Sequence, residues 1–257
     1  MELRDRVAVI TGGGGGIGSA AGRKFAAEGA RAVVLVDRDA AAAEKAAAGL
    51  GEVGWGLGVD VTDEDAIVDL VQTVEERYGP IDVFLSNAGA GGAGGGEEAP
   101  NEAWQKQWEL HVMSHVYAAR AVVPAMVARG EGYLVHTASA AGLLLAVGSL
   151  PYSVTKAACI KLAEGLAITH GDEGIRVSVL CPQGVNTAMA PRQLGDGGTD
   201  GIIEADVVAD VIVDAMAEER FFILPHPEVG EYIKRKADDP DRWLAGMRRL
   251  RARSLVD

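Results

Sequence analysis

The sequence predicts an α/β fold in which a doubly wound parallel sheet of about seven strands is flanked by helices. Two observations predict it. Short, continuous apolar runs, as expected for strands buried on both faces, alternate along the chain with longer helical patterns. The composition is globular, with 257 residues of which 48% are hydrophobic and 24% charged. A chain of this length suits one sizeable domain.

The first repeat of this alternation lies at the N-terminus. Residues 7–10 form an apolar run that predicts a buried strand, and the glycine cluster 12–16 ends it. A helical pattern follows over 17–28, where Gly29 stops it, and a second buried strand is expected over 32–36. Strand, helix and strand in this order form the unit from which parallel sheets are built.

The same unit recurs along the rest of the chain. The later strands are expected at 54–59, 81–85, 132–137, 175–180 and 221–224. The later helices are expected at about 39–50, 62–78, 101–129, 152–172 and 204–219. Thr62 has the residue type and position of an N-cap, and the pair Gly79-Pro80 ends the helix that follows it.

No linker divides the chain, so we expect one domain over residues 1–257. Residues 226–257 are expected to form a helical tail that contacts the pocket or a neighbouring subunit. The glycine-rich segments 89–96 and 195–201 are expected to be loops, the second a candidate lid.

Charge and cysteine content exclude several classes of protein. The net charge of −13 disfavours binding to nucleic acid or to a membrane surface, although the tail is locally basic over 234–253. Cys159 and Cys181, the two cysteines, are far apart in sequence, which predicts a reducing compartment without a disulfide framework. No run is long and apolar enough for a membrane span, and no signal-peptide core precedes the first strand. We therefore expect a cytoplasmic protein with no nucleic-acid or membrane partner.

The glycine cluster predicts a dinucleotide site of the Rossmann type. It begins at Thr11 and runs from a strand into a helix, where backbone N–H groups and the helix dipole bind a pyrophosphate. Asp37 ends the next strand, where a carboxylate accepts hydrogen bonds from the adenosine ribose and repels a 2′-phosphate. Arg38 could hold that phosphate, but Asp37 and the lack of a basic residue at 13–15 favour NAD(H) over NADP(H).

Tyr152 and Lys156 have the YxxxK spacing, which places both side chains on one face of a helix. A neighbouring ammonium stabilises a phenolate, which fits a tyrosine for acid–base chemistry near neutral pH. This spacing alone is common. Combined with Ser139, which follows the predicted strand 132–137, the spacing becomes a strong indication of a catalytic site.

Together these motifs resemble the short-chain dehydrogenase/reductase family over about residues 5–225. Its TGxxxGIG motif matches Thr11 to Gly18, and its NAG motif matches Asn87 to Gly89. The resemblance implies catalysis by Ser139, Tyr152, Lys156 and a residue at the position of His111. The cofactor-binding residues that it implies, together with Asp37 and Arg38, are Gly12, Gly14, Gly16, Ile17, Asp60, Val61, Asn87, Ala88, Gly89, Tyr152, Lys156, Pro182, Gly184, Val185 and Thr187.

The implied reaction interconverts a secondary alcohol and a ketone. Tyr152 exchanges a proton with the substrate oxygen, Ser139 orients that oxygen, and Lys156 binds the nicotinamide ribose. The sequence departs from the family at two places. His111 stands where an asparagine usually supports the proton relay, and Gln183 stands where a glycine usually follows the proline. Histidine can itself pass protons, so an altered relay through His111 is the hypothesis.

Two other functions stay open. A non-catalytic NAD(H)-binding sensor would explain His111 and Gln183, but it has no need of a serine–tyrosine pair. A sugar-nucleotide epimerase or dehydratase generally needs a larger C-terminal domain. We expect no metal site, because His111 and His115 have no third ligand in sight.

The substrate itself is not readable from the sequence. The family builds its pocket from the segments that here cover 90–100 and 188–201. Apolar residues just before Tyr152, such as Leu144 and Val147, favour a hydrophobic alcohol or ketone. Members of the family are usually homotetramers or homodimers, and we expect the same here.

Overall fold

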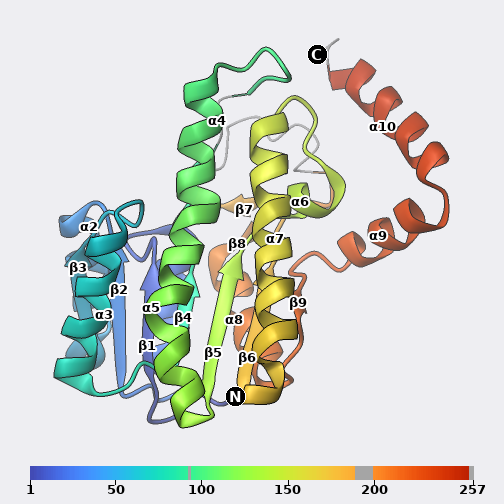
Figure 1. Ribbon diagram of the computed structural model, residues 1–257. Coiled ribbons are helices and arrows are strands. Elements are labelled where there is room, and N and C mark those ends of the chain that lie inside the picture. Colours follow the sequence, from blue (N-terminus) through green and yellow to red (C-terminus); the bar gives the residue numbers. More distant parts are fainter. Residues whose placement is uncertain (92–93, 189–198, 255–257) are drawn as a thin grey trace.

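The sheet of the computed structural model is parallel and has seven strands in the order β3-β2-β1-β4-β5-β6-β9 (Figure 1). Its strands are β1 (Val7–Thr11), β2 (Ala32–Asp37), β3 (Gly54–Gly58), β4 (Val83–Ser86), β5 (Gly132–Thr137), β6 (Ile175–Leu180) and β9 (Phe222–Ile223). The structure describes residues 1–91, 94–188 and 199–254. The strand order reverses direction between β1 and β4, the usual position of a ligand in such sheets. The predicted fold class is confirmed.

Helices cover both faces of the sheet (Figure 1). One face carries α1 (Gly16–Ala27), α2 (Ala40–Ala48) and α8 (Ala205–Ala217), which pack on it through one apolar cluster. The other face carries α3 (Glu64–Tyr78), α5 (Ser114–Arg129) and α7 (Leu150–His170), which pack through a second cluster. The central strands β1, β2 and β4 lie between two hydrophobic layers, which is why their sequences are almost entirely apolar.

Further elements complete the described chain. They are the helices α4 (Asn101–Trp108), α6 (Ala140–Leu144), α9 (Glu228–Asp238) and α10 (Pro240–Ser254), the 3₁₀ turns η1 (Gly51–Val53) and η3 (Gly171–Glu173), the π-helical turn η2 (Glu109–Met113), and the paired strands β7 (Val185–Asn186) and β8 (Ile203–Glu204). The loops expected at 89–96 and 195–201 lie partly outside the described residues, at 92–93 and 195–198.

Two details correct the sequence predictions. The single helix expected over 101–129 contains the π-helical turn η2, in which the backbone hydrogen bonds change register. Thr62 is not the N-cap of α3. Asp63 is, because its carboxylate accepts hydrogen bonds from the amides of Asp65 and Ala66, whereas the Thr62 hydroxyl donates to Asp60.

The C-terminal helices α9 and α10 form an arm that projects from the rest of the domain (Figure 1). A small apolar cluster anchors the arm, in which Val229, Tyr232 and Trp243 pack with Leu144 of α6. The Lys236 ammonium also donates a hydrogen bond to the Leu143 carbonyl, at 2.6 Å. The position of the arm is therefore set by α6.

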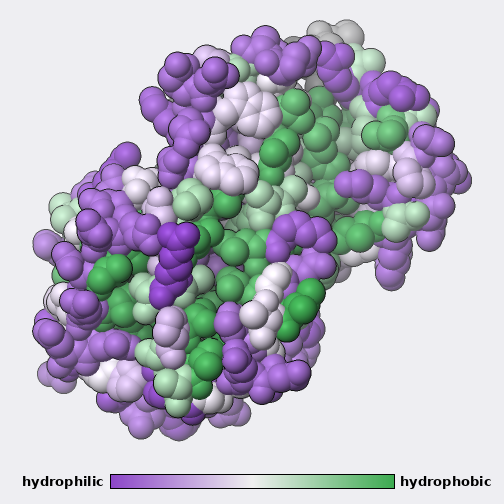
Figure 2. All heavy atoms as spheres, in the orientation of Figure 1, coloured by the Kyte–Doolittle hydropathy of each residue, from purple (hydrophilic) through white to green (hydrophobic). Residues whose placement is uncertain are grey.

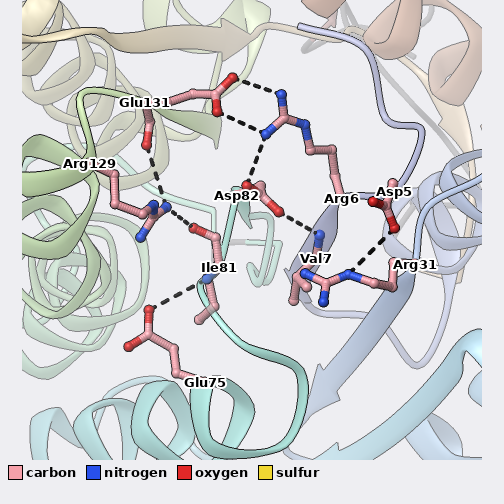
Figure 3. Close-up of polar contacts among 9 residues, drawn as sticks. All are labelled: Asp5, Arg6, Val7, Arg31, Glu75, Ile81, Asp82, Arg129 and Glu131. Atoms are coloured by element: carbon pink, nitrogen blue, oxygen red, sulfur yellow. Dashed lines mark hydrogen bonds and ion pairs between the residues drawn. The ribbon is translucent and has the colours of Figure 1, made fainter.

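Ion pairs join the N-terminal ends of three central strands (Figure 3). Arg6 makes two hydrogen bonds with Glu131, at 2.9 and 2.7 Å, and a third with Asp82 at 3.2 Å. Asp82 in turn accepts a hydrogen bond from the Val7 amide, at 2.8 Å. The network ties β1, β4 and β5 together at one edge and leaves their carboxyl ends to form a site at the other.

Candidate active site

A cavity of about 940 Å³ lies at the carboxyl ends of the central strands. Its wall includes residues from the turn after β1, the end of β2, the loop after β4, the segment from the end of β5 into α7, the loop after β6, and both helices of the C-terminal arm. Segments that are distant in sequence therefore meet around one space, as expected at the carboxyl edge of a doubly wound sheet.

The glycine turn between β1 and α1 forms one end of this cavity. Gly12, Gly16 and Ile17 line it, and Gly15 is the N-cap of α1 without a side-chain hydrogen bond to the helix. A Cβ added at Gly15 would meet no atom within 4 Å, whereas one added at Gly14 would lie 2.9 Å from the Asp37 carboxylate. The turn is thus tightly packed on one side and open toward the cavity on the other, which suits a pyrophosphate at the helix N-terminus.

Asp37 lines the cavity and also fixes the glycine turn. Its carboxylate accepts hydrogen bonds at 3.1 Å from the amides of Gly14 and Asp39. Arg38 is exposed and does not line the cavity. Asp60 accepts two hydrogen bonds from Thr62, which lower the pKa of Asp60, and the Arg38 guanidinium lowers it further.

Asn87 connects three strand ends beneath the cavity. Its amide group donates to the Thr11 carbonyl at 3.0 Å and its carbonyl accepts from the Thr137 hydroxyl at 3.2 Å. The Thr11 hydroxyl accepts from the amides of Asn87 and Ala88, at 2.9 and 3.0 Å. Asn87 thereby fixes the chain that leads to Gly89, which lines the cavity.

Ser139, Tyr152 and Lys156 line the same cavity. Lys156 is 3% exposed, and its ammonium donates to the Thr137 carbonyl at 2.9 Å and lies 5.8 Å from the centroid of the Tyr152 ring. The Ser139 hydroxyl caps α6 by accepting from the Ala141 amide at 3.1 Å, and its own hydrogen faces the Pro182 carbonyl at 3.4 Å. A contact of that length is weak, so the hydroxyl hydrogen can turn to a ligand oxygen.

His111 lies behind Tyr152, within the π-helical turn η2, and does not line the cavity. Its Nε2 accepts from the Ala90 amide at 3.3 Å, which places the ring proton on Nδ1, where the Thr155 hydroxyl lies at 3.2 Å. Burial and the Lys156 ammonium lower the pKa of His111 to about 2. His111 is therefore neutral at physiological pH.

Gln183 follows β6 and belongs to a small polar cluster. Its amide group donates to Asp200 at 2.9 Å, and the Tyr232 hydroxyl donates to the other oxygen of the same carboxylate at 2.8 Å. The Gln183 backbone amide donates to Nδ1 of the buried His226 at 3.3 Å. The side chain that departs from the family pattern thus links the loop after β6 to α9.

A second pair of histidines, which sequence reasoning did not place together, is buried beneath the site. The Nδ1 atoms of His115 and His136 lie 2.9 Å apart, and each side chain is 1% exposed. Burial lowers the pKa of His136 to about 4 and the pKa of His115 well below its usual value. His115 is on α5 and His136 on β5, so their contact depends on tertiary packing that no local pattern signals.

The structure thus brings most of the residues implied by the sequence to one cavity. Those that line it are Gly12, Gly16, Ile17, Asp37, Asn87, Gly89, Ser139, Tyr152, Lys156, Pro182, Gly184, Val185 and Thr187. Those that do not are Gly14, Arg38, Asp60, Val61, Ala88 and His111. Val61 is part of the hydrophobic core. The segments 188–201 and 226–257 were expected at the pocket without single residues being named, and the residues of these segments that line it include Asp200, Tyr232, Arg235 and Leu250.

Comparisons with known proteins agree with this geometry. The family model described as "short chain dehydrogenase" matches residues 6–196. A 1-deoxy-11-beta-hydroxypentalenate dehydrogenase of Streptomyces exfoliatus is 36% identical over 93% of this chain and 90% of its own length. A meso-2,3-butanediol dehydrogenase of Serratia marcescens is 33% identical over 87% of this chain and 92% of its own.

Solved structures also resemble this chain. The crystal structure of a short-chain dehydrogenase/reductase from Burkholderia phymatum, in complex with NAD, superposes with a TM-score of 0.86. It is 29% identical in sequence, and the match covers 94% of this chain and 96% of that one. Within the described residues, no helix is both long and apolar enough to cross a membrane.

Proposed function

The chain belongs to the short-chain dehydrogenase family, and from this premise we propose that it interconverts a hydrophobic secondary alcohol and a ketone with NAD(H). The observation that carries the proposal is that Ser139, Tyr152 and Lys156 line the same cavity as the glycine turn. One relative acts on a hydroxylated pentalenate and another on 2,3-butanediol, as their names state, so oxidation at a hydroxyl-bearing carbon is common to both.

The residues present fit a nicotinamide dinucleotide. The open side of Gly15 and the N-terminus of α1 would hold the pyrophosphate, and Asp37 would accept hydrogen bonds from the adenosine ribose. Asp37 lines the cavity whereas Arg38 does not, which supports NAD(H) over NADP(H). Pro182, Gly184, Val185 and Thr187 would surround the nicotinamide end. The bound cofactor would supply or accept the hydride.

The protein side of the chemistry rests on three groups. The Ser139 hydroxyl turns its hydrogen from the Pro182 carbonyl to the substrate oxygen and so orients it. In oxidation Tyr152 acts as the phenolate and takes the proton of the alcohol, and in reduction the Tyr152 hydroxyl gives this proton to the carbonyl oxygen. The Lys156 ammonium stays fixed on the Thr137 carbonyl, and its remaining N–H groups are available to the ribose.

His111 is the proposed entry to an altered proton relay. A Cβ added at Gly89 would lie 3.6 Å from the Lys156 ammonium and 3.7 Å from Nε2 of His111, so both groups face the same side of Gly89. The relay that we propose places a water molecule between these two groups. Because the pKa of His111 is lowered to about 2, the relay would pass through the neutral ring. One ring nitrogen would accept a proton while the other ring nitrogen releases one. The ring would not hold the extra charge.

The second candidate function is a cofactor-binding sensor without turnover. The observation that favours it is that the Ala90 amide occupies Nε2 of His111, which removes that nitrogen from any relay until the contact opens. The experiment that separates the two functions measures NADH binding together with NADH formation from a panel of secondary alcohols. Tight binding with formation that depends on Tyr152 supports the enzyme, and tight binding without any formation supports the sensor.

We also infer a homotetramer or homodimer in the cytoplasm. Apolar side chains are exposed on helices of one face, among them Trp108 of α4 (41%) and Val154 and Ile168 of α7 (42% and 77%). Figure 2 shows apolar residues in green over the face that carries α5 and α7. A surface of this kind suits contact with a second subunit. Light scattering checks the inference, and a monomer at micromolar concentration would refute it.

A further inference from the structure

The C-terminal arm forms much of the cavity wall on the side that would receive a substrate. It contributes Tyr232 and Arg235 from α9 together with Trp243, Met247 and Leu250 from α10. The segment from α6 to α7 contributes further apolar side chains, which are Leu144, Leu145, Ala146 and Val147. The arm lies outside the part of the chain that the family model matches, residues 6–196.

Few charged groups face this apolar space. Within the described residues the charged side chains that line the cavity are Asp37, Lys156, Asp200 and Arg235. Asp37 holds the glycine turn and Lys156 is bound to the Thr137 carbonyl. Both of these groups belong to the cofactor and the reacting centre. Asp200 and Arg235 are left to act on the rest of a substrate.

Asp200 is already engaged by two neutral donors. The amide group of Gln183 bonds one of its oxygens and the Tyr232 hydroxyl bonds the other, at 2.9 and 2.8 Å. The Asp200 carboxylate also raises the pKa of Tyr232, so that hydroxyl stays a donor. These contacts hold the acid between the loop after β6 and α9, and no ion pair with Arg235 forms within the described residues.

Arg235 is the cation of this wall that forms no ion pair within the described residues. The pKa of Glu231 is lowered first by its hydrogen bond with Lys234 and also by the charge of Arg235, so the guanidinium has an acidic neighbour but no direct carboxylate partner. No carboxylate of the described residues lies within ion-pair distance of its guanidinium, which stays 5.6 Å from the centroid of the Tyr232 ring. The preceding residue behaves differently, since Lys234 pairs with Glu231 at 2.7 Å and does not line the cavity. The anchoring of α9 through Val229 and Lys236 keeps Arg235 at the cavity.

We propose that the cavity takes a secondary alcohol whose apolar skeleton carries a carboxylate, and that Arg235 binds this carboxylate. A guanidinium presents two parallel N–H donors, which match the two oxygens of a carboxylate. The apolar residues of α10 and of the α6–α7 segment would cover the skeleton, while the alcohol carbon lies at Ser139 and Tyr152. This proposal rests on the proposed function and narrows its substrate class.

The negative net charge of the protein makes a local effect of Arg235 easy to distinguish from a general attraction to anions. A net charge of −13 repels anions at long range, so a preference for a carboxylate has to come from a local cation. Because the Arg235 side chain is exposed, solvent screens its attraction, and we expect a preference of about fivefold rather than several hundredfold.

The first experiment measures binding, without turnover. The NADH-loaded protein is titrated by calorimetry with adamantane-1-carboxylate and with adamantane-1-carboxamide, an apolar pair that differs in charge. The wild type should bind the carboxylate about five times more tightly, and Arg235→Gln should remove the difference. Lys234→Gln, which removes the same charge from the neighbouring position, should keep it. Equal or absent binding of the two compounds to the wild type, or a preference that survives Arg235→Gln, would overturn the proposal.

The second experiment uses turnover with NAD+. cis-4-Hydroxycyclohexanecarboxylate is compared with its methyl ester, and Arg235→Gln should raise KM for the acid alone while kcat stays unchanged. Preferred turnover of the ester would contradict the carboxylate proposal and leave the proposed function standing. Failure to oxidise any alcohol, with carboxylate binding that still depends on Arg235, would contradict the proposed function and leave the anion site standing.

Discussion

The rings of His111 and Tyr152 meet edge to face, with centroids 5.5 Å apart and planes at 89°. His111 lies in the π-helical turn between α4 and α5, and Tyr152 lies in the first turn of α7. The Thr155 hydroxyl, on the same helix as Tyr152, bonds the His111 ring and fixes its orientation. The phenol of Tyr152 thus packs against a buried ring whose orientation is fixed from the same helix.

Two roles of His111, a proton relay and packing against Tyr152, can be separated by substitution. Phenylalanine keeps an aromatic edge against Tyr152 but cannot pass a proton. If His111 belongs to the relay, His111→Phe should lower kcat by about tenfold to a hundredfold and leave NADH affinity unchanged. His111→Asn should retain more activity but shift the pH profile of kcat. A wild-type rate and pH profile in both variants would show that His111 only packs.

Ser139 should contribute both to the rate of catalysis and to the stability of the fold. Ser139→Ala removes the hydrogen bond to the substrate oxygen, and we expect kcat to fall by about a hundredfold. It also removes the cap of α6, which should cost about 1 kcal/mol in the free energy of unfolding, as measured with urea. Ser139→Asn can still cap the helix and serves as the control. Equal kcat in the wild type and Ser139→Ala would exclude the proposed role.

The choice of cofactor should depend on the charge of Asp37. Asp37→Asn keeps an oxygen that can accept from the Gly14 amide but removes the negative charge. We therefore expect the ratio of kcat/KM for NAD+ over NADP+ to fall by about tenfold or more. Arg38→Gln in the same background should lower the activity with NADP+ again. A ratio that Asp37→Asn leaves unchanged would contradict the assignment of NAD(H).

Acid should destabilise the protein through its buried histidines. The pKa of His111 is lowered to about 2, that of His136 to about 4, and that of His115 well below its usual value. Below a pH of about 6.5 the unfolded chain therefore binds more protons than the folded one. Their contribution to stability is complete above that pH and is lost as the pH falls toward 4. Three such groups give a slope of up to about 4 kcal/mol per pH unit.

Urea unfolding between pH 4 and 7 checks this slope. The titratable groups that face His115 are His136, His111, Lys156 and Cys159. The positive charge of Lys156, and that of either histidine once it is protonated, would add to the penalty for charging His115. The double variant His115→Met/His136→Met removes two of the three histidines and should flatten the pH dependence. The same slope in both proteins would mean that the acid sensitivity arises from carboxylates.

The sequence predicts the fold well where local patterns determine it. Apolar strands such as β1, β2 and β4 and the glycine turn at residues 12–16 locate the sheet and its carboxyl edge, because burial on both faces leaves a continuous apolar run in these strands. The sequence predicts Thr62 as the N-cap of α3, but the N-cap is Asp63, since both residue types can cap a helix and only the geometry separates them.

The candidate site is predicted less completely, for a different reason. Ser139, Tyr152 and Lys156 lie in spaced motifs, but Arg235 and Tyr232 reach the cavity only through the packing of α9 on α6. The contact between His115 and His136 likewise joins a helix to a strand. No spacing rule connects such residues, because the tertiary structure alone brings them together.

The most direct test of the proposed reaction compares the wild type with Tyr152→Phe for both NADH binding and NADH formation. Phenylalanine keeps the ring packed against His111 and removes only the hydroxyl. We predict NADH affinity within about twofold of the wild type, and formation of NADH from secondary alcohols lowered by at least about a thousandfold. Formation of NADH by Tyr152→Phe at the wild-type rate would contradict the assignment of Tyr152 as the acid/base.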